Sequence, residues 1–206
     1  MSARIVTFGE IMLRLKSPGF ERLFQSPTLE ATFGGGEANV AVSCANYGMD
    51  ASFVTVLPDN DVARACAREL RGFGVDTRDI VYTAGRMGIY FVESGAVQRP
   101  SKVIYDRAGS AIAEARPGDV DWKKAFADAA WFHMVIANEE DVQKALGISA
   151  ESAASVEEGK IDTSVYESIA KAVMKAYPNV SRVAITLRES KSASHNDWSA
   201  CLYNGR

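Results

Sequence analysis

Three consecutive glycines mark the first place in this sequence that suits a small ligand. Gly34, Gly35 and Gly36 stand between a strand-like segment and a segment with helical spacing, and Asn39 follows them. Glycines allow a tight turn and close approach to the backbone, and free N–H groups at a helix N-terminus suit hydroxyl, carboxylate or phosphate groups. Asn39 offers both donors and acceptors. The turn predicts a site for a polar small molecule, but it would serve equally well to pack a helix closely.

Two tyrosines and an arginine form a second group of candidates, at Tyr90, Tyr105 and Arg107. A planar guanidinium binds a carboxylate through two parallel hydrogen bonds, and a tyrosine offers a flat face and a hydroxyl. This combination favours a ligand that carries a carboxylate. The structural alternative is a pair of half-buried rings beside a surface salt bridge between Asp106 and Arg107.

An acidic run, Asn138-Glu139-Glu140-Asp141, follows an apolar segment. Carboxylates at the end of a strand suit Mg²⁺, which prefers oxygen ligands and retains several waters. The alternative is an acidic first turn of a helix, which the helix dipole favours. The residues alone favour the helix turn, and a metal contact from Glu139 and Asp141 would be weak and through water.

A strand-like segment at 185–191 ends in polar side chains. Donors that suit a nucleotide phosphate are present at Thr186, Arg188, Ser190 and Lys191. The alternative is an ordinary strand exit. The motifs GxxxxGK[ST] and GxGxxG do not occur in the sequence, so a nucleotide site would be of another type.

Alternating strands and helices must position these residues. Strands are expected at 4–10, 51–57, 131–133, 134–137 and 182–187, and helices after Gly36, from about 61 to 72, at 119–129 and at 165–176. Such alternation predicts an α/β fold with a parallel sheet between helices.

Other strand candidates follow one another without helices. They lie at 11–16, 28–33, 80–84, 87–93 and 102–106. Strands in direct succession predict an antiparallel patch, which we interpret as a small lid built within 11–33 and 87–106. The segment 198–203, followed by Asn204-Gly205, predicts the first arm of a hairpin.

Composition indicates a soluble globular protein, because 47% of the 206 residues are hydrophobic and 24% are charged. The net charge, 23 − 26 = −3, gives no sign of a nucleic-acid or anionic-membrane partner. Three cysteines without CxxC spacing and two isolated histidines do not form a zinc pattern and fit a reducing compartment. Without a hydrophobic leader or bilayer-length apolar stretch, we expect a cytoplasmic protein.

Together and in this order, the motifs resemble the ribokinase-like (PfkB) carbohydrate kinases. The run from Gly34 to Ala41, followed by Gly48, is similar to that family's signature G-G-x-small-x-N-x-A and a later glycine. Glu37 replaces the small residue, and Pro58 replaces a usual glycine. Both departures, with the segments 87–93 and 103–111, resemble the branch that phosphorylates 2-keto-3-deoxygluconate.

The resemblance implies one three-layer α/β/α kinase domain over residues 1–206, with a β-sheet lid that pairs subunits into a homo-oligomer. The implied reaction transfers the γ-phosphate of ATP to a primary hydroxyl of a sugar acid, with Mg²⁺. The implied sugar-acid site contains Gly34, Gly35, Gly36, Asn39, Tyr90, Tyr105 and Arg107. The implied ATP and Mg²⁺ region contains Asn138, Glu139, Asp141, Thr186, Arg188, Ser190 and Lys191.

Two features of such kinases have no counterpart in the sequence. One is a helix and a strand ending in D-x-N-x-R after a segment like 131–133, and the other is a G-A-G-D motif whose aspartate is the general base. We therefore expect an incomplete kinase domain and assign no catalytic base. The alternatives are a kinase for fructose, ribose or a nucleoside, and a non-catalytic relative that binds sugar acids; only Arg107 distinguishes an acid from a neutral sugar.

Overall fold

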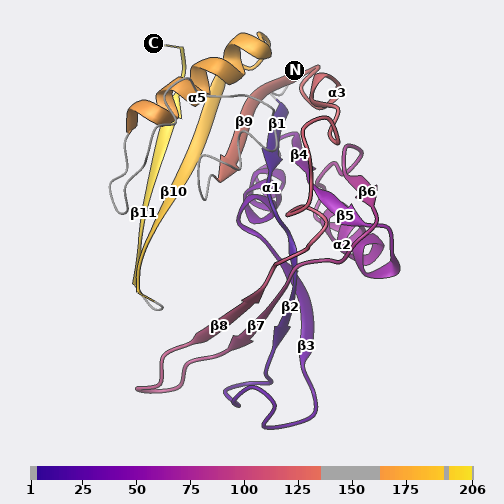
Figure 1. Cartoon of the computed structure of the whole chain (residues 1–206), viewed down its shortest axis with the longest axis vertical. Helices are drawn as coiled ribbons and strands as arrows, with labels where there is room; N and C mark the ends of the chain where they lie inside the picture. The colour runs from indigo at the N-terminus through magenta and orange to yellow at the C-terminus, as the bar shows by residue number, and fades with distance from the viewer. Residues whose placement is uncertain (1–3, 136–162, 193–194, 206) are drawn as a thin grey trace.

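A largely parallel sheet forms the centre of the molecule. The computed structural model describes residues 4–135, 163–192 and 195–205. In spatial order the strands are β11 (His195–Tyr203), β10 (Arg182–Ser192), β9 (Ala129–Val135), β1 (Arg4–Phe8) and β4 (Ala51–Val54). All neighbours pair in parallel except β10 and β11, which are antiparallel (Figure 1).

Helices cover both faces of this sheet. On one face, α1 (Gly36–Asn46) and α2 (Asp61–Gly72) enclose an apolar cluster with Phe53 of β4. On the other face, α3 (Trp122–Ala125) and α5 (Thr163–Ala176) enclose a second cluster that includes the adjacent Val54. Successive strand residues point to opposite faces, so the two clusters lie on opposite sides of the sheet. The predicted three-layer α/β/α fold is confirmed.

A second sheet projects from the main body as a separate blade (Figure 1). Its strands, in spatial order, are β3 (Glu30–Gly34), β2 (Met12–Lys16), β7 (Ile89–Glu93) and β8 (Lys102–Asp106). They lie in the stretches from which we expected a lid, with Gly34 added to β3. The sheet is mixed, because β2 and β7 are parallel. Parallel neighbours need a long crossover, and here the chain between them runs through α1 and α2 of the main body.

The expected strand at 51–57 is in fact two strands. β4 pairs with β1, whereas β5 (Val56–Pro58) pairs with β6 (Val81–Thr83) in a separate small sheet. The chain changes partner at Thr55, whose carbonyl accepts from the Val81 N–H at 3.0 Å. The segment 80–84 therefore belongs beside the main sheet and not in the lid.

The expected helix at 119–129 is also wrong for most of its length. Only α3 is helical there, capped by the Asp121 side chain, which accepts from the Lys124 N–H. Ala129 is already a partner of Arg4 in the parallel sheet. The segments 131–133 and 134–137, expected as separate strands, are joined through the His133–Met134 peptide in β9, which ends at Val135.

The segment 198–203 does form a hairpin, but it pairs with the strand before it and not with one after it. β11 is the second arm of a hairpin with β10, which continues to Ser192 and not only to 187. Within the described residues, every helix falls short of the length and apolar character needed to cross a bilayer.

Candidate functional site

The lid joins the main body where β1 ends. Residues 9–11 lead from the C-terminal end of β1 directly into β2, and α1 begins directly after β3. Ligands of open α/β sheets bind outside the carboxyl ends of the strands, where side chains from several elements meet. The hinge between lid and sheet is therefore the expected place for a site.

Gly34 lies against the two tyrosines of the lid. A β-carbon at Gly34 would come closer than 3 Å to the Tyr90 hydroxyl. Tyr90 is paired with Tyr105 across β7 and β8, and the ring centroids are 5.9 Å apart. The structure thus brings the glycine turn and both tyrosines together, and their contact with a sugar stays a prediction.

Gly35 lies against the residue that holds Arg107. A β-carbon at Gly35 would collide with the Glu10 carbonyl oxygen, and its φ of −168° is open to any residue, so close approach alone explains the glycine. The Glu10 carboxylate is 8% exposed and accepts from Arg107 Nε at 2.5 Å and from Ser110 Oγ at 3.1 Å. Sequence reasoning missed Glu10, whose only local signal is a carboxylate between two strand segments.

The salt bridge between Asp106 and Arg107, given above as the structural alternative, is not formed. Asp106 forms a two-pronged salt bridge with Arg86, at 2.8 and 2.9 Å, and does not neutralise Arg107. Asp106 is the last residue of β8 and Arg107 the first residue after it, and the two side chains have different charged partners. Arg107 remains on the side of Glu10, with its side chain 53% exposed.

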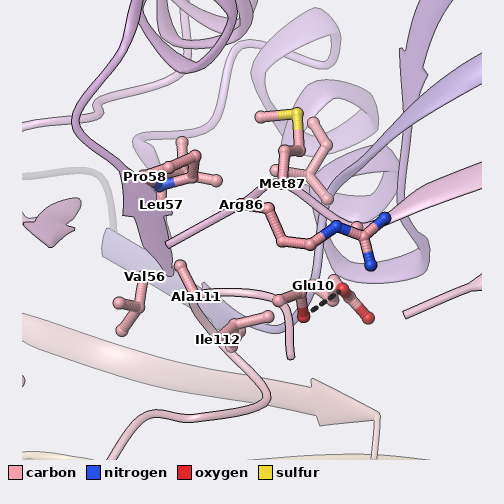
Figure 2. A pocket seen from close by; sticks show the side chains of 11 residues that line it. Glu10, Val56, Leu57, Pro58, Arg86, Met87, Ala111 and Ile112 are labelled. Atoms are coloured by element: carbon pink, nitrogen blue, oxygen red, sulfur yellow. Dashed lines mark hydrogen bonds between the residues drawn. The ribbon is translucent and has the colours of Figure 1, made fainter. Parts of the chain in front are cut away.

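A small pocket extends from Glu10 into the main body. β5 and the residues around Met87 and Ala111 line it, and it has no space large enough for a water molecule. Figure 2 shows Glu10 on one side of this pocket and the apolar side chain of Val56 on the other. The Glu10 carboxylate accepts from Ser110 Oγ. The pocket combines the Glu10 carboxylate and the Arg86 guanidinium with apolar walls, and Tyr90, Tyr105 and Arg107 do not line it.

Tyr90 is chemically distinct from an exposed tyrosine. Burial raises the pKa of Tyr90 above its usual value, although the neighbouring Arg14 guanidinium acts in the opposite direction. A tyrosine phenol is protonated at neutral pH in any case, so Tyr90 can donate a hydrogen bond to a ligand.

Comparison with known proteins identifies the family. Residues 2–194 match the profile of the pfkB family carbohydrate kinases. The chain belongs to the pfkB family of carbohydrate kinases.

Three similar proteins are named 2-dehydro-3-deoxygalactonokinase or 2-dehydro-3-deoxygluconokinase. A 2-dehydro-3-deoxygalactonokinase of Haloferax volcanii is 41% identical over 120 residues, 58% of this chain and 38% of that protein. A 2-dehydro-3-deoxygluconokinase of Thermoproteus tenax is 32% identical over 119 residues, 57% of this chain and 37% of that protein. The crystal structure of a Thermotoga maritima 2-dehydro-3-deoxygluconokinase is 39% identical with a TM-score of 0.63, covering 98% of this chain and 78% of that one. The chain thus spans less than two fifths of the matched curated relatives' length.

The start of α1 presents free backbone groups beside the lid. Gly35 is the N-cap of α1 and Gly36 its first residue, and no side chain caps the first turn. The Asn39 N–H donates to the Gly35 carbonyl, while the Asn39 side chain is exposed. The contact of Asn39 with a sugar stays a prediction.

The residues expected at the ATP and metal sites are only partly described. Asn138, Glu139 and Asp141 lie outside the described residues. Thr186, Arg188, Ser190 and Lys191 lie on β10 opposite β11, a position given by the backbone alone. Among the described residues there is no cluster of three metal-ligating side chains. The roles of all seven residues in binding ATP and Mg²⁺ remain predictions.

Gly35→Ala is expected to lower the free energy of unfolding by about 1–3 kcal/mol, because the new methyl group meets backbone atoms that cannot step aside. Gly34→Ala is expected to cost less, since the Tyr90 hydroxyl is the movable end of a side chain. Urea denaturation followed by circular dichroism measures both. Gly72→Ala is the control: nothing lies within 4 Å of its β-carbon, so stability should hold or rise. An equal loss of unfolding free energy in all three variants would show that close packing at Gly35 does not explain the effect.

Proposed function

We propose that this chain contains the sugar-binding part of an ATP-dependent kinase that phosphorylates 2-keto-3-deoxygluconate (2-dehydro-3-deoxygluconate) at a primary hydroxyl. The observation that supports this most is the meeting of Gly34, Tyr90 and Tyr105 with the Glu10–Arg107 pair at one hinge. Similar proteins named 2-dehydro-3-deoxygalactonokinase and 2-dehydro-3-deoxygluconokinase support the choice of substrate.

Each group at the hinge has a task in this proposal. Arg107 uses Nε for Glu10, which leaves its terminal nitrogens for the carboxylate of the sugar acid. Tyr90 and Tyr105 flank the carbon chain and donate to its oxygens. The uncapped N–H groups at the start of α1 bind hydroxyls without adding charge.

In this proposal ATP would supply the phosphoryl group, and Mg²⁺ would neutralise the charge on the phosphate oxygens of ATP. We place ATP beside Thr186, Arg188, Ser190 and Lys191, with Asn138, Glu139 and Asp141 in the Mg²⁺ region. This placement is supported by family membership. No residue of the chain is assigned as the general base.

Two further properties belong to the proposal. A cytoplasmic location is supported by the three free cysteines Cys44, Cys66 and Cys201.

Pairing with a second copy through the lid is supported by exposed apolar side chains there, namely Phe20, Phe24, Val103 and Ile104 at 41–71% exposure. Sedimentation velocity should show a dimer; a monomer at micromolar concentration would rule the pairing out.

The substrate is tested by binding and by turnover. Titration calorimetry should show binding of 2-keto-3-deoxygluconate, and a coupled assay of ADP formation should show its phosphorylation by the product of the complete gene. Fructose and ribose should be poor ligands. Preference for fructose would instead support a neutral-sugar kinase, and acid binding without ADP formation would support a non-catalytic binding protein.

A further inference from the structure

One arginine of the lid has no role in the site described so far. Arg14 of β2 is paired with Thr32 of β3 and with Tyr90 of β7, and Tyr90 is paired with Tyr105 of β8. Directly paired residues of neighbouring strands project from the same face of a sheet. Thr32, Arg14, Tyr90 and Tyr105 therefore form one row across the lid, on the face that carries both tyrosines of the site.

The row is also close to the glycine turn. Gly34 follows Thr32 by two residues on β3, hence on the same face, and is paired with Met12, two residues before Arg14. The Tyr90 hydroxyl lies where a Gly34 side chain would be. Arg14 thus borders the volume that the proposed sugar acid would fill.

Charge distinguishes Arg14 from the other cations on this face. Arg107 is neutralised by Glu10, and Lys16, two residues after Arg14, is neutralised by Glu30 at 3.4 Å. Arg14 Nε donates to the neutral Thr32 Oγ1 at 2.7 Å, and its other close neighbour is the Tyr90 phenol. Between residues 4 and 135 and in the later described segments, no carboxylate forms an ion pair with Arg14.

We infer that Arg14 is a specificity-determining residue, whose uncompensated guanidinium selects a carboxylated sugar over a neutral one and shares the carboxylate with Arg107. The inference rests on the proposed function. An Arg107 that is already paired with Glu10 attracts an anion weakly from a distance, because the two charges cancel. Arg14 keeps its full charge, and its bond to Thr32 fixes the plane of the guanidinium before a ligand arrives.

The test compares 2-keto-3-deoxygluconate with its neutral analogue, in which a hydroxymethyl group replaces the carboxylate. Titration calorimetry gives the Kd of each ligand for the wild type and for Arg14→Gln, which keeps hydrogen-bonding capacity but removes the charge. We expect Arg14→Gln to weaken binding of the acid about ten- to a hundredfold, the range of a charge-assisted hydrogen bond. Binding of the neutral analogue should change less than about threefold.

Lys16→Gln is the matched control, since it removes the same charge from the same strand and face but from a paired side chain. Acid binding should be unchanged in that variant. Thr32→Val is a second, nearly isosteric variant that keeps the charge and releases Arg14 Nε. It should weaken acid binding several-fold without affecting the neutral analogue, and it tests the inference even if Arg14→Gln does not fold.

Three outcomes overturn the inference. Unchanged acid binding in Arg14→Gln would remove Arg14 from the site while leaving the proposed function intact. Equal losses for the acid and the neutral analogue would show that Arg14 only supports Tyr90. If the wild type binds neither ligand, the proposed function itself fails, and the inference fails with it.

Discussion

Arg107→Ala is expected to raise KM and Kd for 2-keto-3-deoxygluconate about ten- to a hundredfold. On the proposed function the variant loses a charge-assisted pair between Arg107 and the carboxylate. Such a pair is worth about 1.5–3 kcal/mol, and each 1.4 kcal/mol corresponds to a factor of ten. The carboxylate is remote from the phosphorylated hydroxyl, so its contact is equal in the ground and transition states and kcat should change little. Steady-state kinetics over a wide substrate range separate the two constants.

Two further variants make this result specific. Lys102→Ala removes a positive charge from the exposed start of β8, the same strand that leads to Arg107, and should leave KM unchanged. Arg107→Lys keeps the charge opposite Glu10 but loses the planar fork, and should give an intermediate KM. An unchanged KM in Arg107→Ala would remove Arg107 from the pocket, and an equal loss of a neutral substrate would assign it a structural role.

The parts of the site that could be predicted from the sequence are those with local signals. The Gly34–Gly36 turn stands between two recognisable periodicities, so its place at a strand end and helix start follows from neighbouring residues. Tyr90 and Tyr105 each lie in a strand-like run with a turn between the runs, and such segments pair with each other.

Glu10 and Arg14 could not be predicted in the same way. Glu10 meets Arg107 across 97 positions of sequence, and the contact exists only because β2 and β8 belong to one sheet. For Arg14, alternation with Leu13 and Leu15 shows that it faces away from them, but not which face of the lid turns to the ligand. The order and register of the strands decide which face of the lid lies beside the glycine turn, and the periodicity of a single strand does not reveal them.

The errors in the predicted fold have the same origin. An apolar run such as 51–57 looks like one strand, and only its partners reveal that β4 and β5 belong to different sheets. The residues Trp122, Ala125, Phe126 and Ala129 have helical spacing and are all buried, yet Ala129 pairs with Arg4 because β1 needs a parallel neighbour. In each case tertiary pairing overrides local propensity.

Arg4→Met is expected to lower the free energy of unfolding by about 3–5 kcal/mol, because it removes one member of a buried charge cluster. Arg4 lies at the start of β1, far from the hinge, with its side chain 6% exposed. Its guanidinium contacts Asp76 and Asp79 at 3.3 Å and also binds Asp128. Asp79 is itself 6% exposed, so without Arg4 its carboxylate stays buried, and among the described residues Lys124 is its one remaining charged partner.

Chemical denaturation of three variants separates this effect from a general loss of charge. Arg78→Met removes a cation that is 67% exposed from the same cluster and should cost less than about 1 kcal/mol. Adding Asp79→Asn to Arg4→Met removes the stranded carboxylate and should restore part of the stability, since an amide is less costly to bury than an unpaired charge. If Arg4→Met costs no more than Arg78→Met, the cluster is not what fixes β1 against its neighbours. The chain runs from β1 directly into the hinge that contains Glu10, and then into β2 with Arg14. The Arg4 charge cluster lies at the opposite end of β1, so we expect Arg4→Met to leave binding of the sugar acid unchanged. A loss of acid binding without a loss of stability would instead show that the two ends of β1 are coupled.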